Sequence, residues 1–319
     1  MASGYCWNDK HVANGNSFWK YVLNKVKTLY IPYLLCNFLF LFLNNFFVAT
    51  GLYASSTDYL DLIGSNDTNL LHSTLTFPQI FKQQIYICLM LSGTELGGPT
   101  WFFRSLFLSL VIFASIRFTL NRVFKNKKTI LIIELCFALF SILIAWLISD
   151  EKVSFLMFDR SFAAYPLLVI GGWLHRLDDV WNRTKWQLII LAIIAMGVLL
   201  LLNPLGNISM ARCKIENPFF FLTVSLAGWF LLSSVSKIIP LRPLAKLGET
   251  TRSIVMWHMI SMKLVTLSYI IIAGLPMLLL GSFPVIYDSP SYLWIIYSIV
   301  CTLIPYFMGV TYDRIKSHF

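Results

Sequence analysis

Charged side chains are scarce in this sequence. Asp, Glu, Lys and Arg make up 13% of its 319 residues, about half the share that is usual in a soluble domain. The chain also has no C-x-x-C pair and no H-E-x-x-H, G-x-S-x-G or phosphate-binding glycine loop, so the common signatures of metalloproteases, serine hydrolases and nucleotide hydrolases are missing. It has no zinc-finger or RNA-binding motif, and we expect no nucleic-acid partner.

Hydrophobic residues are abundant instead, at 57%, and they form long runs such as Ile31–Val48, Phe102–Phe118 and Trp186–Leu202. A lipid core about 30 Å thick requires roughly 20 apolar residues of helix. These runs lack the alternation of barrel strands, and helices are the other structure that satisfies its backbone in lipid. The sequence therefore predicts an all-α, polytopic transmembrane helical bundle, with residues 1–319 as a single membrane domain.

We expect about eight spans. They lie near Ile31–Val48, Phe102–Phe118, Ile130–Ile148, Phe162–Leu174, Trp186–Leu202, Phe219–Val235, Ile254–Leu278 and Tyr292–Tyr312. The fourth is short and holds Pro166, Gly171 and Gly172. A further apolar segment, Phe81–Leu91, is too short to cross, which favours an interfacial or re-entrant helix.

Basic residues predict the orientation, because Lys and Arg concentrate on the cytoplasmic side of a membrane. Every second connection is rich in them: Lys20, Lys25 and Lys27 before the first span, Arg122, Lys125, Lys127 and Lys128 after the second, Arg176, Arg183 and Lys185 after the fourth, Lys237, Arg242, Lys246 and Arg252 after the sixth, and Arg314 after the last. The connections between them hold fewer, namely Lys82, Lys152, Arg160, Arg212 and Lys214. This alternation places both termini in the cytoplasm.

Ionisable groups inside a span are candidates for function, since a charge in hydrocarbon is costly unless it is paired or hydrated. Arg104 lies near the outer start of the second span, one turn after Trp101. Its guanidinium can clamp a carboxylate, phosphate or sugar oxygen, or it can extend to the outer headgroups. We predict that Trp101 and Arg104 bind substrate.

His258 lies about a turn and a half into the seventh span from the cytoplasmic side. A neutral histidine can act as a general base at cellular pH, or it can simply be hydrogen-bonded between helices. Glu134, about one turn into the third span, either forms a buried ion pair with Lys263 or orients His258. We take His258 and Glu134 as the catalytic candidates, and we predict no metal site.

Lys25 and Lys27 belong to the basic group that precedes Pro32 on the predicted cytoplasmic surface. Such a group is a topology determinant in almost any membrane protein. It can also hold the phosphates of a nucleotide-bearing donor, and we predict that both lysines bind substrate in this way.

Several segments in this order resemble the acyltransferase 3 family of integral-membrane O-acyltransferases. Ser3-Gly4-Tyr5, followed by KYVLNKVKTLYIPYL, resembles the family's SGY or SGF, a basic stretch and then L-I-P-Y. GGPTWFFRSLFLSL resembles its WFL-x-x-L span, and AYPLLVIGGWL resembles its P-x-x-x-x-G-x-x-L span. LGETTRSIVMWHMI, which contains His258, resembles LG-x-x-S/T-x-x-I-x-x-x-H.

The resemblance implies a fold of about ten helices. It also implies transfer of an acyl group, expected to be acetyl, from a cytoplasmic donor such as acetyl-CoA to a hydroxyl of a sugar or cell-surface polysaccharide. The donor is then a co-substrate and no cofactor is bound. The implied partners are the lipid bilayer, the acyl donor and a glycan acceptor, and the implied location of this multi-pass protein is the plasma membrane.

The chain departs from the family pattern in two places. The family's first span carries an arginine and a histidine held to be catalytic, and nothing in this chain corresponds, since the sequence begins at the SGY that closes the family's second span. On that comparison the front two helices are missing, and we expect little transfer by this chain alone. Where the family often has two arginines three apart, this chain has Lys25 and Thr28, and lysine lacks the bidentate geometry of arginine.

The sequence is also compatible with two other functions. Polytopic architecture, the interrupted fourth span and the buried charges also suit a transporter or flippase of a lipid-linked glycan. A non-catalytic membrane partner that associates with a full-length relative is the third possibility. Composition and spacing show a multi-span protein, and acyl transfer rests on the resemblance.

Overall fold

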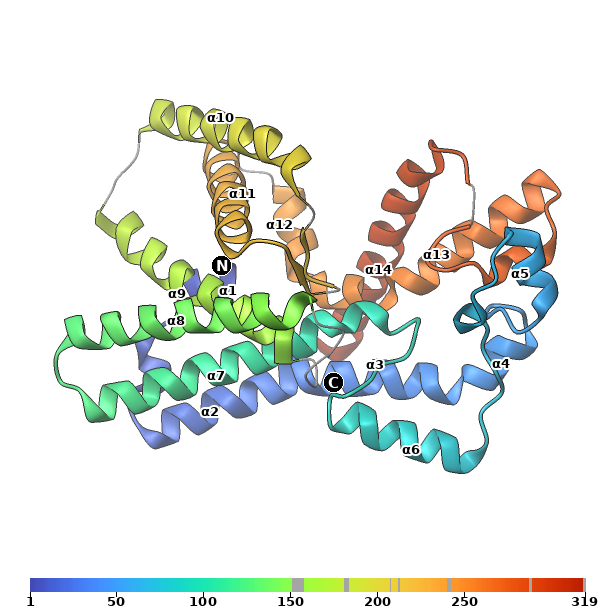
Figure 1. The fold of residues 1–319 in the computed structure, drawn as a ribbon, viewed down its shortest axis with the longest axis horizontal. Coiled ribbons are helices and arrows are strands. Elements are labelled where there is room, and N and C mark those ends of the chain that lie inside the picture. Colours follow the sequence, from blue (N-terminus) through green and yellow to red (C-terminus); the bar gives the residue numbers. More distant parts are fainter. Residues whose placement is uncertain are drawn as a thin grey trace. The chain divides into compact units, whose positions relative to one another are not determined.

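The computed structural model is helical almost throughout (Figure 1), which confirms the predicted all-α class. It describes residues 1–150, 158–180, 184–206, 208–211, 213–239, 242–286 and 289–317. Three of the basic residues used for the orientation, Lys152, Arg183 and Arg212, lie outside the described residues. The orientation of the termini stays a prediction.

From the N-terminus to the C-terminus, the helices and strands are α1 (Ala2–Tyr5), η1 (Asp9–Val12), α2 (Gly15–Lys25), the π-helical turn η2 (Val26–Tyr30), α3 (Ile31–Phe42), α4 (Asn44–Ala49), α5 (Thr57–Ile63), η3 (Thr68–Leu70), α6 (Phe77–Cys88), η4 (Gly98–Thr100), α7 (Trp101–Val123), α8 (Lys127–Asp150), α9 (Phe158–Val180), α10 (Lys185–Leu202), η5 (Asn203–Leu205), β1 (Ile208–Ser209), β2 (Lys214–Ile215), α11 (Pro218–Ile238), α12 (Arg242–Glu249), α13 (Thr251–Ala273), η6 (Met277–Gly281) and α14 (Leu293–Ser317). β1 and β2 form a short antiparallel pair.

Seven helical stretches of the described chain are long and apolar enough to cross a membrane. They are Gly15–Phe42, Gly98–Val123, Lys127–Ser149, Lys185–Leu205, Pro218–Ile238, Thr251–Ala273 and Leu293–Ile315. These match seven of the eight predicted spans. The remaining one, Phe162–Leu174, lies in α9, which has 23 residues and so is long enough to cross. Asp159 and Arg176 within that helix lower its hydropathy.

The first span begins earlier than the apolar run indicates. The helix starts at Gly15, where the side chain of Asn14 accepts a hydrogen bond from the backbone N–H of Ser17 and so caps the first turn. It continues through η2 into α3 and ends at Phe42. The sequence prediction started at Ile31 because the lysines before it lower the mean hydropathy, although lysines on one face of a helix do not interrupt it.

The chain divides into two compact units. Unit one comprises Met1–Pro32 and Phe102–Leu241, and unit two comprises Tyr33–Trp101 and Arg242–Phe319. The prediction of one domain over residues 1–319 stays a prediction.

Glycines allow a close helix contact in unit one. α1 packs on α9, and a Cβ placed on Gly4 would overlap the backbone carbonyl of Leu168. A Cβ on Gly171 would likewise overlap the carbonyl of Met1. Small residues permit such approach between helices in a membrane. The Ser3-Gly4-Tyr5 segment and the Gly171-Gly172 pair are thus two sides of one contact.

The rest of unit one packs through aromatic side chains. Phe18 of α2 stacks on Phe118 of α7, with ring centroids 4.8 Å apart. Trp7 meets Phe113 of α7 edge to face at 4.8 Å. One buried cluster joins α7, α8 and α9 through Leu110, Phe113, Ala138, Tyr165, Leu168 and Val169. Figure 1 shows α2, α7 and α8 running alongside one another in this unit.

In unit two α13 and α14 form a helical hairpin. The hydroxyl groups of Thr266 and Tyr297 are 2.8 Å apart across it, and Ser253 donates a hydrogen bond to the carbonyl of Pro305 at 2.8 Å. A buried cluster of Val265, Ile270, Leu280, Ile286, Leu293, Tyr297 and Cys301 lies between these helices and the segment that joins them.

A neutral polar group fixes the other half of unit two. Asn37 is fully buried and donates hydrogen bonds to the carbonyl of Tyr33 at 2.9 Å and to the hydroxyl of Thr100 at 2.8 Å. Its carbonyl oxygen accepts from the backbone N–H of Thr94 at 2.8 Å. The segment before α7 is therefore held to α3 by an amide whose donors and acceptor are satisfied.

Candidate functional site

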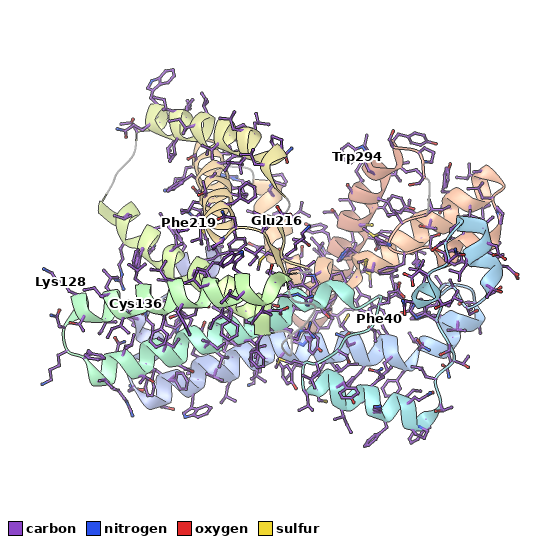
Figure 2. All side chains as sticks on the ribbon, viewed as in Figure 1. Phe40, Lys128, Cys136, Glu216, Phe219 and Trp294 are labelled. Carbon is purple, nitrogen blue, oxygen red and sulfur yellow. The ribbon has the colours of Figure 1, made fainter. Side chains whose placement is uncertain are left out.

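His258 lies at a cavity between the two helices of the α13–α14 hairpin. The cavity measures about 700 Å³, within the range of ligand sites. Its walls combine apolar side chains with hydroxyl groups, and the residues lining it are Ile254, Val255, His258, Met262, Val285, Ser289, Pro290, Ser291, Trp294, Tyr297, Ser298, Cys301 and Thr302. Trp294, labelled in Figure 2, is 66% exposed at the start of α14. A ligand with both an apolar face and hydroxyl groups fits such walls.

The hydrogen bonds of His258 define its tautomer. Nδ1 lies 2.9 Å from the carbonyl oxygen of Ile254 and 3.1 Å from that of Val255. A carbonyl can only accept, so Nδ1 carries the hydrogen of the neutral ring. Nε2 then carries the lone pair, and it has no hydrogen-bond partner among the described residues. This is the form that a general base requires.

A second cavity, of about 760 Å³, lies along α2 in unit one. It is lined by Lys10, His11, Asn16, Ser17, Trp19, Lys20, Tyr21, Leu23, Asn24 and Lys27. Three of these side chains are cationic, and none of the described residues that line it is acidic. We call this the basic cavity. Ammonium groups with neighbouring amide and hydroxyl groups are suited to phosphate, and the aromatic rings offer surfaces for a planar base.

The two lysines predicted to bind substrate have different surroundings in the structure. Lys27 lines the basic cavity. Lys25 instead packs over the ring of Tyr21, with Nζ 5.1 Å from the ring centroid. Partial burial, and then the charge of Lys25, lower the pKa of His11, so this histidine is held in its neutral form beside the cavity. The π-helical turn that carries Lys27 begins directly after Lys25, and such turns are frequent at functional sites.

Glu134 belongs to a charge network in unit one. It is fully buried, and Arg117 of α7 donates to both of its oxygens, from Nε to Oε1 and from Nη2 to Oε2 at 2.9 Å. Nη1 of Arg117 donates to Oδ1 of Asp9 at 2.6 Å. Arg176 of α9 lies 3.6 Å from the same carboxylate. The guanidinium thus ties α8 and η1 to α7 through a bidentate pair.

Two predicted pairings involve residues of different units. Glu134 lies in unit one, whereas His258 and Lys263 lie in unit two. Within its own unit each has other partners: Glu134 binds Arg117, and Lys263 donates to the carbonyls of Leu280 and Ser282. An ion pair between Glu134 and Lys263, and an orienting role of Glu134 toward His258, stay predictions.

Arg104 and Trp101 lie in the first turn of α7. Arg104 is buried, with 3% of its surface exposed, which favours the interpretation of an internal guanidinium over one that reaches the outer headgroups. Trp101 is half-buried. Substrate binding by both residues stays a prediction.

Two further groups were not predicted from the sequence. Arg117 lies within an apolar run, so it is a candidate for function on the same grounds as Arg104, because a charge inside a span is costly. Its position near the predicted cytoplasmic end of the span, however, is also typical of a topology determinant. The imidazole of His72 contacts the carboxylate of Glu95, and its ring stacks on Tyr53 at 4.4 Å. His72, Glu95 and Tyr53 lie in a long connection whose sequence shows neither helical nor strand periodicity. Only the tertiary structure therefore shows that these three side chains are in contact.

A comparison with known families identifies the chain. The family model described as an acyltransferase domain matches residues 11–311. The match includes the residues that line the His258 cavity and all those that line the basic cavity except Lys10, and it confirms the resemblance found in the motifs. No curated protein and no solved structure matches the chain.

Proposed function

Since this chain belongs to the acyltransferase 3 family and its described residues include seven helices long and apolar enough to cross a membrane, it is a membrane acyltransferase, and we propose that it acylates a hydroxyl group of a sugar or cell-surface polysaccharide. The donor in this proposal is acyl-CoA, with acetyl as the acyl group, and the location is the plasma membrane. The observation that supports it best is His258, whose Nε2 carries the lone pair of the neutral ring and whose side chain lines a cavity of about 700 Å³.

His258 supplies the base in this proposal. Its Nε2 takes the proton of the acceptor hydroxyl while the hydroxyl oxygen attacks the thioester carbonyl. The C–S bond then breaks, and the proton passes to the leaving thiolate, so that an ester and a free thiol are formed. The hydrogen bond from Nδ1 to the carbonyl of Ile254 keeps the ring in one orientation throughout.

The basic cavity is proposed to hold the donor. Coenzyme A carries several phosphates and an adenine, and the cavity offers Lys10, Lys20 and Lys27 beside Trp19 and Tyr21. Donor binding there is expected to weaken as ionic strength rises, because the lysines are exposed and screened by salt.

Kinetics with the chain in lipid vesicles test the two roles separately. The assay follows label transfer from acetyl-CoA to a soluble polysaccharide. His258→Gln is expected to lower kcat by about 100-fold or more, since it removes a general base. Lys20→Gln and Lys27→Gln are each expected to raise KM for acetyl-CoA by about fivefold without a matching change in kcat, as one weak ion pair is lost.

The control variant is Lys128→Gln, which removes an exposed lysine of α8 in the same unit (Figure 2) and should leave both constants unchanged. Transfer that persists in His258→Gln would overturn the role of this histidine. Donor binding without any transfer would contradict the role of His258 as the base, and movement of a glycan across vesicles without a donor would favour the flippase.

A further inference from the structure

Lys263 is a buried cation without a hydrogen-bonded carboxylate among the described residues. It lies in the middle of the candidate span α13, and 3% of its surface is exposed. Its Nζ donates to the carbonyl oxygens of Leu280 at 2.8 Å and of Ser282 at 2.7 Å. The charge of Glu95 acts on it, but the carboxylate of Glu95 is already in contact with His72. A charge held in this way inside a span suggests a function.

An ammonium group has three N–H donors. Two are used by the carbonyls, and the ring of Phe283, 5.5 Å from Nζ, offers only a weak cation–π contact. Within the part of the chain that the structure describes, the third donor has no hydrogen-bond acceptor. A buried donor of this kind costs free energy unless a ligand or water completes it.

Lys263 also lines a cavity of about 350 Å³, which we call the acyl cavity. Its other walls are apolar except for one hydroxyl, and the residues lining it are Phe47, Thr50, Leu52, Leu96, Ile260, Lys263, Leu264, Leu267, Met277 and Leu280. At about 30 Å³ for each water-sized group, it holds about a dozen non-hydrogen atoms.

The rim of the acyl cavity includes apolar side chains that are exposed. Leu264, in the middle of α13, is 47% exposed, and Met277 is 56% exposed. At this depth of a transmembrane helix the surrounding medium is hydrocarbon or another apolar surface. A ligand made largely of methylene groups can therefore reach the cavity from the bilayer.

We propose that the acyl cavity binds a medium-length acyl chain, with a carboxyl oxygen accepting the third N–H of Lys263 and the hydrocarbon tail lying against the apolar walls. The cavity size matches decanoate. The same chemistry has two sources, a free fatty acid or the ester-linked chain of a membrane lipid. The inference concerns binding alone and holds or fails independently of any transferase activity.

The test is photolabelling of the full chain in detergent with decanoate that carries a diazirine near its methyl end. Labelled peptides are expected from α13 or from the segments that contain Phe47–Leu52 and Met277–Leu280. Unlabelled decanoate should displace the probe, whereas decyltrimethylammonium, with the same chain and the opposite charge, should not. Didecanoyl-phosphatidylcholine separates the sources: equal displacement identifies a lipid ester, and displacement by decanoate alone identifies a free acid.

Variants decide the role of the ammonium. Lys263→Met keeps an unbranched side chain but removes the ammonium, and it should weaken displacement by decanoate about tenfold, as a charge-assisted hydrogen bond is lost. Leu267→Trp fills the cavity, keeps the ammonium and should abolish labelling. Lys82→Met, which removes an exposed lysine of α6, is the matched control. Labelling outside the cavity, equal displacement by the cationic probe, or unchanged binding in Leu267→Trp would each overturn the inference.

Discussion

The two units hold a buried cation in different ways. In unit one the guanidinium of Arg117 faces two carboxylates, Glu134 and Asp9, and all its contacts to them are short. In unit two the ammonium of Lys263 is held by two backbone carbonyls and lines a cavity. Both side chains are nearly fully buried.

This difference indicates whether each cation has a structural role or a binding role. A planar guanidinium that meets a carboxylate at both oxygens is fixed in position, and breaking such a buried pair leaves an uncompensated charge. An ammonium on carbonyl oxygens leaves no buried carboxylate behind when it is removed, and its remaining donor can serve a ligand. We therefore interpret the Arg117 network as structural and Lys263 as a binding residue.

Replacement of Arg117 is expected to have the largest effect. Arg117→Met should lower the free energy of unfolding by about 3–5 kcal/mol, because the carboxylate of Glu134 stays buried without its partner. Arg117→Met combined with Glu134→Leu should recover much of the loss. A loss below about 1 kcal/mol, or no recovery in the double variant, would contradict the structural interpretation.

Unfolding of each unit can be followed with a maleimide dye that fluoresces on reaction with exposed thiols. Cys213 is a free, buried thiol of unit one, and Cys36 and Cys301 are free, buried thiols of unit two. Burial raises the pKa of the Cys213 thiol to about 12, so it reacts slowly while folded, since the thiolate is the reactive form. In a variant whose other cysteines have been replaced, the buried thiols of one unit report the unfolding of that unit alone.

The helix contact of unit one gives the next largest effect. Gly4→Val places a side chain on the backbone carbonyl of Leu168, which cannot move without displacing α9. The expected loss is about 1–3 kcal/mol, as for other overpacked contacts. Gly228→Ala is the control, because a Cβ there meets nothing within 4 Å. Equal stability of the Gly4→Val variant and the parent chain, measured at Cys213, would refute the contact.

The corresponding change in unit two should cost less. Lys263→Met removes the charge and leaves two carbonyls without a partner, but it also removes the desolvation cost of the ammonium. The expected net loss is about 1–2 kcal/mol, measured at Cys36 and Cys301. A loss as large as that of Arg117→Met would show that the two cations are equally structural.

The smallest effect is expected at the exposed end of the Arg117 network. Burial alone would raise the pKa of Asp9, but the charge of Arg117 and the hydrogen bonds from Trp7 and Arg117 outweigh it, so this pKa is below its ordinary value. The lowered pKa means that its contribution is complete above the unfolded pKa and is lost as pH falls through the folded one. Because 60% of the side chain is exposed, Asp9→Asn should cost less than about 1 kcal/mol.

The pH dependence provides the measurement. Melting temperatures of the parent chain and of Asp9→Asn are expected to differ at neutral pH and to converge in the acid range, where the carboxylate of Asp9 is protonated in both folded and unfolded chains. A difference that grows as pH falls would have the wrong sign and would remove Asp9 from the network.

Much of the site was visible in the sequence, for reasons of local chemistry. His258 and Lys263 stand out because an ionisable residue in an apolar run is rare, and the tautomer of His258 follows from carbonyls within its own helix. The basic cavity is also local, since Lys20, Tyr21 and Lys27 share one helical stretch. The first span started too late in the prediction because hydropathy registers the lysines and not the helix that carries them.

The sequence by itself determined that the chain enters a membrane and which of its side chains are costly there, since burial in hydrocarbon depends on composition over one helix length. Only the tertiary structure decided the partners of those side chains. Glu134 meets Arg117 across 17 positions of chain, and Lys263 meets the carbonyls of a segment beyond the end of its own helix. Such pairings depend on which helix faces touch, and the period of a helix gives its faces but not its neighbours.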